Sequence, residues 1–262
     1  MLNYFTIKCE INRGIATVTL DRPEVHNAFN SELINELYEC FTLLSEDKDI
    51  RVVVLTAKGK SFCAGADLNW MKSVVNYSYE QNLEESKKLA ALMYLIFTFP
   101  IPVIGRINGS AIGGGVGLVS VCDILIAEEN AKFGLSEVRL GLVPAVISPY
   151  VISRIGLAKA RELFITGERI PSEEAQRIGL INYVVSKELL DTLVQDKATS
   201  ILQSGPEAVK MAKQMILKPL LAQLKELNEY NASLIANLRL SAEGQEGMNA
   251  FLEKRKPCWL RD

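Results

Sequence analysis

The sequence has a single histidine, His26, in 262 residues. A Ser-His-Asp or Cys-His catalytic arrangement would therefore have to use this one residue as its base. The five cysteines are odd in number and scattered, and none forms a Cys-x-x-Cys pair. This spacing predicts neither a disulfide framework nor a metal site, and it favours a reducing compartment such as the cytoplasm.

An excess of positive charge is also missing. The chain has 29 Lys and Arg against 31 Asp and Glu, a formal net charge of −2. Such a chain has no general attraction to nucleic acid or to an acidic membrane. The longest apolar stretch, residues 111–127, is short for a bilayer span and contains Asp123. The first ten residues predict neither an export nor a transit segment. We therefore expect no nucleic-acid and no membrane partner.

The chain contains enough apolar sequence for a sizeable core, since 48% of its residues are hydrophobic and 23% are charged. Residues 4–20 predict a β-hairpin with an Asn-Arg-Gly turn at 12–14. A helix should begin at Asn30 or Ser31. Short continuous apolar runs, typical of strands covered on both faces, follow at residues 52–55, 103–107 and 124–126.

The later parts of the chain favour helices. Residues 58–67 predict a loop, and residues 81–99 predict a helix that ends before two prolines. From residue 147 to about residue 240 the pattern is mainly helical. Strands that alternate with helices, followed by helices alone, indicate an α/β core with a helical C-terminal section.

Two loops rich in small residues follow predicted strands, at residues 61–68 and 108–117. Small residues let a ligand approach backbone N–H groups, and the second loop leads into a predicted helix whose first N–H groups are unpaired. Two such loops could present two donors to one developing oxyanion. Either loop alone is more often a tight turn or a packing contact, and neither fits a phosphate-binding or dinucleotide-binding motif.

These loops belong to a longer series of motifs in a fixed order. The segments are DRPEVHNAF (21–29), FCAGADL (62–68), NGSAIGGG (108–115), CD (122–123), FGLSEVRLGLVP (133–144), TG (166–167), EGM (246–248) and FLEKRKP (251–257). Together they resemble the crotonase (enoyl-CoA hydratase/isomerase) family over essentially the whole chain. The resemblance implies a ClpP-like α/β spiral of ββα repeats over residues 1–195. A helical trimerisation section over residues 196–262 would follow, in a homotrimer or a hexamer.

The resemblance also implies the chemistry. Members of the family bind acyl-CoA thioesters and stabilise an enolate, with coenzyme A as part of the substrate and with no further cofactor or metal. The oxyanion donors would be the backbone N–H groups of Ala66 and Gly114, and the proton-transfer residue would be Glu137. The implied substrate-binding residues are Ala64, Gly65, Asp67, Leu68, Ala28, Arg139, Phe251 and Lys254.

One position departs from the pattern of the family's hydratases. These typically have two glutamates, and the position of the first is Gly117 here. Hydration remains the leading interpretation, and an enoyl-CoA isomerase that uses Glu137 alone is the alternative. Another activity of the family, such as decarboxylation or thioester hydrolysis, comes third, and a CoA-binding scaffold or an RNA-binding role comes last.

The segments at residues 65–83 and 136–150 are similar to those of bacterial methylglutaconyl-CoA hydratases. This similarity implies hydration of 3-methylglutaconyl-CoA, in leucine breakdown, rather than of a straight-chain fatty acyl-CoA. Such a substrate has a second carboxylate, for which Arg139 is a candidate partner. A structural salt bridge of Arg139 is an equally good interpretation.

Overall fold

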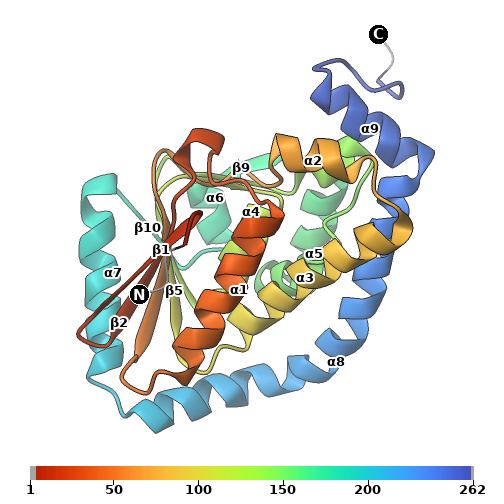
Figure 1. Ribbon diagram of the computed structural model, residues 1–262. Helices are drawn as coiled ribbons and strands as arrows, with labels where there is room; N and C mark the ends of the chain where they lie inside the picture. Colours follow the sequence, from red (N-terminus) through yellow and green to blue (C-terminus); the bar gives the residue numbers. More distant parts are fainter. Residues whose placement is uncertain (1–3, 261–262) are drawn as a thin grey trace.

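The computed structural model describes residues 4–260, apart from the side chain of Lys225 (Figure 1). Residues 1–3 and 261–262, the ends of the two sections expected from the sequence, lie outside the described residues. A six-stranded sheet has the order β1 (Ile7–Asn12), β2 (Ile15–Leu20), β3 (Val52–Ala57), β5 (Val103–Ile107), β7 (Ile124–Glu128) and β10 (Tyr183–Val185). A smaller sheet has the order β4 (Ser61–Cys63), β6 (Ser110–Ile112), β8 (Lys132–Gly134) and β9 (Arg169–Pro171).

Helices surround the two sheets. Their bounds are α1 (Ser31–Glu46), α2 (Leu68–Val74), α3 (Tyr79–Phe97), α4 (Gly114–Val121), α5 (Ser148–Thr166), α6 (Ser172–Arg177), α7 (Lys187–Leu202), α8 (Pro206–Leu240) and α9 (Ala242–Leu252), with short 3-10 turns η1 (Pro23–Val25) and η2 (Ser136–Leu140). None of the described helices is both long enough and apolar enough to pass through a bilayer.

The predicted hairpin is confirmed. The β1 and β2 strands pair antiparallel, and Asn12 faces Ile15 across a turn in which Arg13 and Gly14 both have positive φ, 49° and 81°. A two-residue turn with positive φ at both residues has a twist that matches the twist of the two strands that it connects. The next helix begins as expected, because the Asn30 side chain accepts a hydrogen bond from the Leu33 N–H at 2.9 Å.

The chain then repeats one unit, which confirms the predicted spiral. A strand of the large sheet is followed by a strand of the small sheet and by helix: β3, β4, then α2 and α3; β5, β6, then α4; β7, β8, then η2 and α5. In each sheet these strands pair in parallel with those of the preceding unit. Successive units therefore stack, and equivalent positions in them lie side by side.

The large sheet is covered on both faces. Figure 1 shows α7 on one side of the sheet, and α1, α3, α4 and α5 on the other. On the α7 side, Leu190, Val194 and Ala198 pack against sheet residues such as Val54 and Ile104. The division expected between residues 195 and 196 falls inside this helix.

Short strands were missed by the sequence analysis. Strand β4 lies in the expected loop at residues 58–67, and β9 and β10 interrupt the region that was expected to be helical. Each has three residues, which is too few for hydrophobic periodicity to reveal. Of these three, β4 is one of the parallel strands of the small sheet whose ends form the candidate site.

The C-terminal helices wrap the core. Helix α8 has 35 residues and contains Pro219, which removes one backbone donor, and Figure 1 shows the helix curving around the molecule toward α9. Its first part is attached by Lys213, a buried residue whose Nζ lies 2.6 Å from Asp123 Oδ2 and 3.2 Å from the Ile101 carbonyl oxygen. Asp123 also accepts the Val103 N–H at 2.7 Å, so the pair connects α8 to the sheet.

Replacing Lys213 with methionine should lower the free energy of unfolding by about 2 kcal/mol, because Asp123 would stay partly buried without its cation. Urea unfolding measures the change. Lys159→Met is the matched control: it removes the more exposed pair with Glu162 on α5 and should change stability by less than about 0.5 kcal/mol. Equal effects of the two substitutions would contradict this role of Lys213.

Candidate active site

The three parallel strands of the small sheet end at the same edge. Strand β6 lies between β4 and β8, with Ala111 paired to Cys63 and Ile112 paired to Gly134. The segments that follow the three strands therefore meet, and residues 64–66, 113–114 and 136–137 all line one cavity of about 410 Å³. The cavity is bounded on its other sides by α2, α3, α8 and α9.

Close contacts between the loops require glycine at several positions. Gly65 has a φ of 93°, and a Cβ there would lie 3.1 Å from the Ile112 carbonyl oxygen. A Cβ at Gly115 would overlap the Cys63 carbonyl oxygen. A Cβ at Gly114 would lie 3.1 Å from the ring of Phe29, and the backbone of Phe29 forms a parallel β-bridge with Ala66. The two glycine-rich loops are therefore in direct contact, as an oxyanion site built from both of them requires.

The predicted oxyanion donors are free to bind a ligand. Phe29 forms backbone hydrogen bonds with Gly65 and Asp67, the neighbours of Ala66 on either side. Within the described part of the chain, no acceptor pairs with the backbone N–H of Ala66 or of Gly114. The Gly114 N–H is unpaired because Gly114 is the first residue of α4, where helix geometry supplies no acceptor.

Glu137 lies in η2, directly after the third short strand, and its carboxylate faces the second glycine-rich loop. A Cβ at Gly113, which has a φ of 53°, would lie 2.9 Å from Glu137 Oε1. Although the residue is partly exposed to the cavity, Glu137 Oε2 is enclosed and has no hydrogen-bond partner among the described residues. Burial raises the pKa of the Glu137 carboxyl to about 7. Near neutral pH the group can therefore both accept and donate a proton.

A second carboxylate, that of Glu85, also lines the cavity but is already engaged. It accepts hydrogen bonds from Ser31 Oγ at 2.6 Å and from Lys88 Nζ at 3.0 Å. Burial raises the pKa of Glu85, but the two hydrogen bonds and the positive charge of Lys88 together outweigh burial and hold the pKa below its usual value. Glu85 is therefore a fixed anion, and Glu137 is the group suited to proton transfer.

The position of the missing glutamate has no room for a side chain. Gly117 lies in α4, and a Cβ there would overlap Ile147 Cγ2 and would lie 3.3 Å from Met93 Cε. Ile147 is buried and lines the cavity. An apolar side chain from the segment before α5 thus fills the space beside Gly117. The two residues form a matched pair, and a glutamate at position 117 would not fit beside Ile147.

Comparison with known proteins identifies the family of the chain. The family model described as enoyl-CoA hydratase/isomerase matches residues 10–262. The chain belongs to this family. A short-chain-enoyl-CoA hydratase of Clostridium acetobutylicum is 35% identical, with 92% of each chain covered, and a crotonyl-CoA hydratase of Syntrophomonas wolfei is 33% identical, with 98% covered. The crystal structure of an enoyl-CoA hydratase from Shewanella pealeana has a TM-score of 0.80 at 38% identity and covers 97% of this chain and 96% of its own.

The structure brings many of the expected family residues to the cavity but not all of them. Those that line it are Ala64, Gly65, Ala66, Gly114, Glu137, Arg139 and Phe251. Ala28, Asp67, Leu68 and Lys254 are not among the lining residues. The Asp67 side chain caps α2 through the Asn69 and Trp70 N–H groups and lies 2.9 Å from Arg22 Nη2. Leu68 and Lys254 are exposed, and Ala28 is buried.

Cavity residues from the helices were missed by the motif analysis. The most informative is Arg239, near the end of α8, whose guanidinium lies over the Trp70 ring at 5.7 Å. Arg169, from β9, also lines the cavity. In the sequence, Arg239 is one charged residue in a long helix. Its position was the one available signal for the site: Arg239 lies on the same side of α8 as the buried Ile235 and Ala236, where a charged residue is unexpected. In the part of the chain that the structure describes, no three His, Cys, Asp or Glu side chains group as metal ligands.

The raised pKa of Glu137 predicts a pH-dependent stability. The carboxyl is neutral in both states below its unfolded pKa of about 4.5 and ionised in both above its folded pKa of about 7. Between these values the unfolded state is ionised while the folded state keeps its proton, so stability is lost as pH rises from about 4.5 to about 7. Glu137→Gln should leave stability unchanged near pH 4.5 and raise it by about 2 kcal/mol at pH 8, less than the full shift because the cavity is open. Urea unfolding of both proteins from pH 4.5 to 8 checks this, and a pH-independent difference would contradict it.

The contact between Gly117 and Ile147 predicts a compensating pair of substitutions. Gly117→Glu alone should lower the free energy of unfolding by more than about 2 kcal/mol, because the side chain meets Ile147 and Met93. Gly117→Glu combined with Ile147→Gly should recover part of this loss, since the obstructing side chain is removed. Thermal unfolding of the two single variants and the double variant measures the coupling. Additive losses would show that Ile147 does not occupy the space beside Gly117.

Proposed function

We propose that this protein is an enoyl-CoA hydratase in which Glu137 alone transfers protons at the acyl group. The observation that carries the proposal is the position of the enclosed Glu137 carboxyl, beside the loop that presents the unpaired Gly114 N–H. The named hydratases among the relatives, similar over nearly their full length, support water addition as the reaction.

One carboxylate can perform both proton transfers of hydration if water and the α-proton are on the same face of the substrate. Ionised Glu137 takes a proton from water as the water oxygen bonds to the β-carbon. The electrons of the double bond move toward the thioester carbonyl, whose oxygen becomes an enolate held by the Ala66 and Gly114 N–H groups. Protonated Glu137 then returns the proton to the α-carbon. Because the pKa of Glu137 is about 7, neither taking up the proton nor giving it back is strongly unfavourable near neutral pH.

For the substrate, the proposal is 3-methylglutaconyl-CoA, in leucine degradation. Its support is the similarity of residues 65–83 and 136–150 to methylglutaconyl-CoA hydratases, and the presence of arginines in the cavity wall. Coenzyme A enters as part of the substrate, and the reaction needs no other cofactor. The backbone at residues 64–68, together with Ala28, Phe251 and Lys254, would contact the CoA portion. The five cysteines, all free, are suited to a cytoplasmic location.

For the assembly, the proposal is a homotrimer or a hexamer. Helix α8 carries exposed apolar side chains, including Met215 at 71% and Ile216 at 68% exposure. Apolar patches of this kind commonly mark protein–protein contacts.

A second candidate function is enoyl-CoA isomerisation, in which one base moves a proton between two carbons. The observation that favours it is the pairing of Gly117 with Ile147, which leaves Glu137 as the one carboxylate suited to proton transfer among the described cavity residues. Isomerisation leaves the mass of the substrate unchanged, whereas hydration adds one water, so the two activities are easily distinguished.

The test is an assay resolved by mass with crotonyl-CoA, 3-methylglutaconyl-CoA and 3-hexenoyl-CoA. We expect water addition to the first two, and a loss of at least about 100-fold in kcat for Glu137→Gln, because the amide cannot accept the proton. Conversion of 3-hexenoyl-CoA without a change in mass, and no water addition to the others, would identify an isomerase. Full activity of Glu137→Gln would remove Glu137 from the mechanism.

A further inference from the structure

Arg239 is a cation in the cavity wall with little to bind inside the protein. Its Nη1 donates to Asn82 Oδ1 at 3.4 Å and to Ser86 Oγ at 3.5 Å, both long hydrogen bonds to neutral groups. No other hydrogen bond from the guanidinium is found among the described residues. A guanidinium has five N–H donors, so most of its donors remain available to a ligand.

The charge of Arg239 has no direct counterion either. No carboxylate in the described part of the chain lies within 4.0 Å of it. Glu85 is the anion that acts on it, but the Glu85 oxygens already accept from Ser31 and Lys88. Burial lowers the pKa of Arg239 to about 10, so the group remains protonated near neutral pH. A half-buried positive charge with no carboxylate in direct contact is unfavourable, and an anionic ligand would relieve this.

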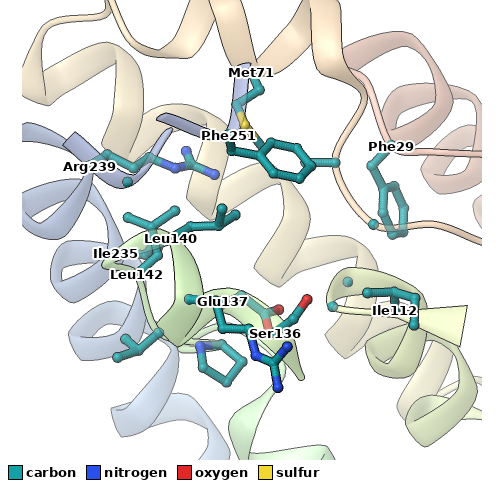
Figure 2. A pocket seen from close by; sticks show the side chains of 18 of the residues that line it. Phe29, Met71, Ile112, Ser136, Glu137, Leu140, Leu142, Ile235, Arg239 and Phe251 are labelled. Atoms are coloured by element: carbon teal, nitrogen blue, oxygen red, sulfur yellow. The ribbon is translucent and has the colours of Figure 1, made fainter. Parts of the chain in front are cut away.

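On its inner side, Arg239 faces apolar side chains of the cavity wall. Figure 2 shows its guanidinium pointing inward above Leu140, whereas Glu137 lies below Leu140 in the same view. Met71, Ile235 and Leu142 line this region as well. Trp70, beneath the guanidinium, and the contacts with Asn82 and Ser86 fix the position of Arg239 against α2 and α3. Arg239 is thus a positioned cation between Ser86 and an apolar part of the cavity wall, apart from the proton-transfer group, and the neighbouring Glu85 carboxylate is already paired with Ser31 and Lys88.

We propose that Arg239 binds a carboxylate at the far end of the acyl group, and so selects enoyl-CoA thioesters of dicarboxylic acids. This rests on the proposed function, because it assumes that the acyl group reaches from Glu137 into this cavity. A guanidinium suits the task because its planar N–H groups pair with both oxygens of a carboxylate. A carboxylate would be placed poorly in the apolar wall without it, and an uncharged chain end would leave Arg239 without a counterion.

Arg139 is the competing candidate for the same role. It lines the cavity from η2, but it is exposed, and in the described residues no ion pair involves it. Water screens an exposed cation, so a carboxylate gains less from it than from an enclosed one. Arg239 should therefore dominate selection.

The first experiment measures binding without turnover, by calorimetry with saturated thioesters. The probes are succinyl-, glutaryl- and adipyl-CoA, each beside an uncharged counterpart in which an isopropyl group replaces the terminal carboxylate. We expect at least one diacid to bind at least about tenfold more tightly than its counterpart, as a charge-assisted hydrogen-bonded pair would give. If none of the three is preferred, the proposal is overturned.

The variants then assign the preference to a residue. Arg239→Met should remove the preference, because it should weaken binding of the diacid while the affinity for the uncharged counterpart changes by less than about twofold. Arg239→Lys should keep part of the preference because the charge remains. Arg139→Met is the matched comparison and should retain the preference. If Arg239→Met weakens the binding of both probes equally and lowers the Tm, Arg239 is merely structural. If the preference is lost only in Arg139→Met, the role belongs to Arg139.

The second experiment separates this inference from the proposed function, using hydration of glutaconyl-CoA and crotonyl-CoA. We expect Arg239→Met to lower kcat/KM at least about tenfold for glutaconyl-CoA but less than about threefold for crotonyl-CoA, chiefly through KM. Hydration of both substrates with equal losses would overturn the inference and leave the hydratase intact. Diacid binding that depends on Arg239, without hydration of either substrate, would overturn the hydratase and leave the anion site.

Discussion

Backbone hydrogen bonds between the short parallel strands β4, β6 and β8 hold the candidate site together. Each strand has three residues, and Phe62, Ala111 and Phe133 at their centres are buried. Ala66, Gly114 and Glu137 follow these strands at a distance of two or three residues. Because the strands are parallel neighbours that end at the same edge, the donors and the candidate base converge, although Ala66 and Glu137 are about 70 residues apart in the chain. The spiral of the larger sheet supplies the stacking that makes this register possible.

The chemistry depends on charges kept out of water. Burial of Glu137 raises the pKa of its carboxyl, and this same burial is unfavourable once the group is ionised. Burial likewise disfavours the charged form of Arg239 and lowers the pKa of its guanidinium. Both groups face the cavity, so a water molecule that gives a proton to Glu137 and a substrate carboxylate that pairs with Arg239 would together relieve both. Free and substrate-bound states should therefore differ more in electrostatics than in shape.

Local patterns predicted much of the fold. The Asn-Arg-Gly turn, the Asn30 cap and the apolar runs of β3, β5 and β7 were all found where the sequence indicated them. The strands of three residues were missed because so short a run has no measurable period. Their stability comes from pairing with neighbours that are distant in sequence, and no local pattern records that.

The site was predictable where it depends on backbone and not where it depends on packing. The small residues at 64–66 and 113–115 and the Phe-Gly-x-x-Glu segment marked the loops and the base. That Ile147 fills the space beside Gly117 could not be predicted, because the two residues are 30 positions apart and meet only through the packing of α4 against the segment before α5. Arg239 was missed for the same reason, since only the fold of α8 brings it to the cavity.

The contact between Gly117 and Ile147 also has a consequence for how such a site can change over generations. A glutamate gained at 117 first would be crowded by Ile147, and an isoleucine lost at 147 first would leave a hole in the core. Each single step is disfavoured although the pair of steps is tolerable, because neighbouring residues do not act independently. A change between one and two carboxylates at this site would therefore have to cross a barrier of packing unless both positions change together.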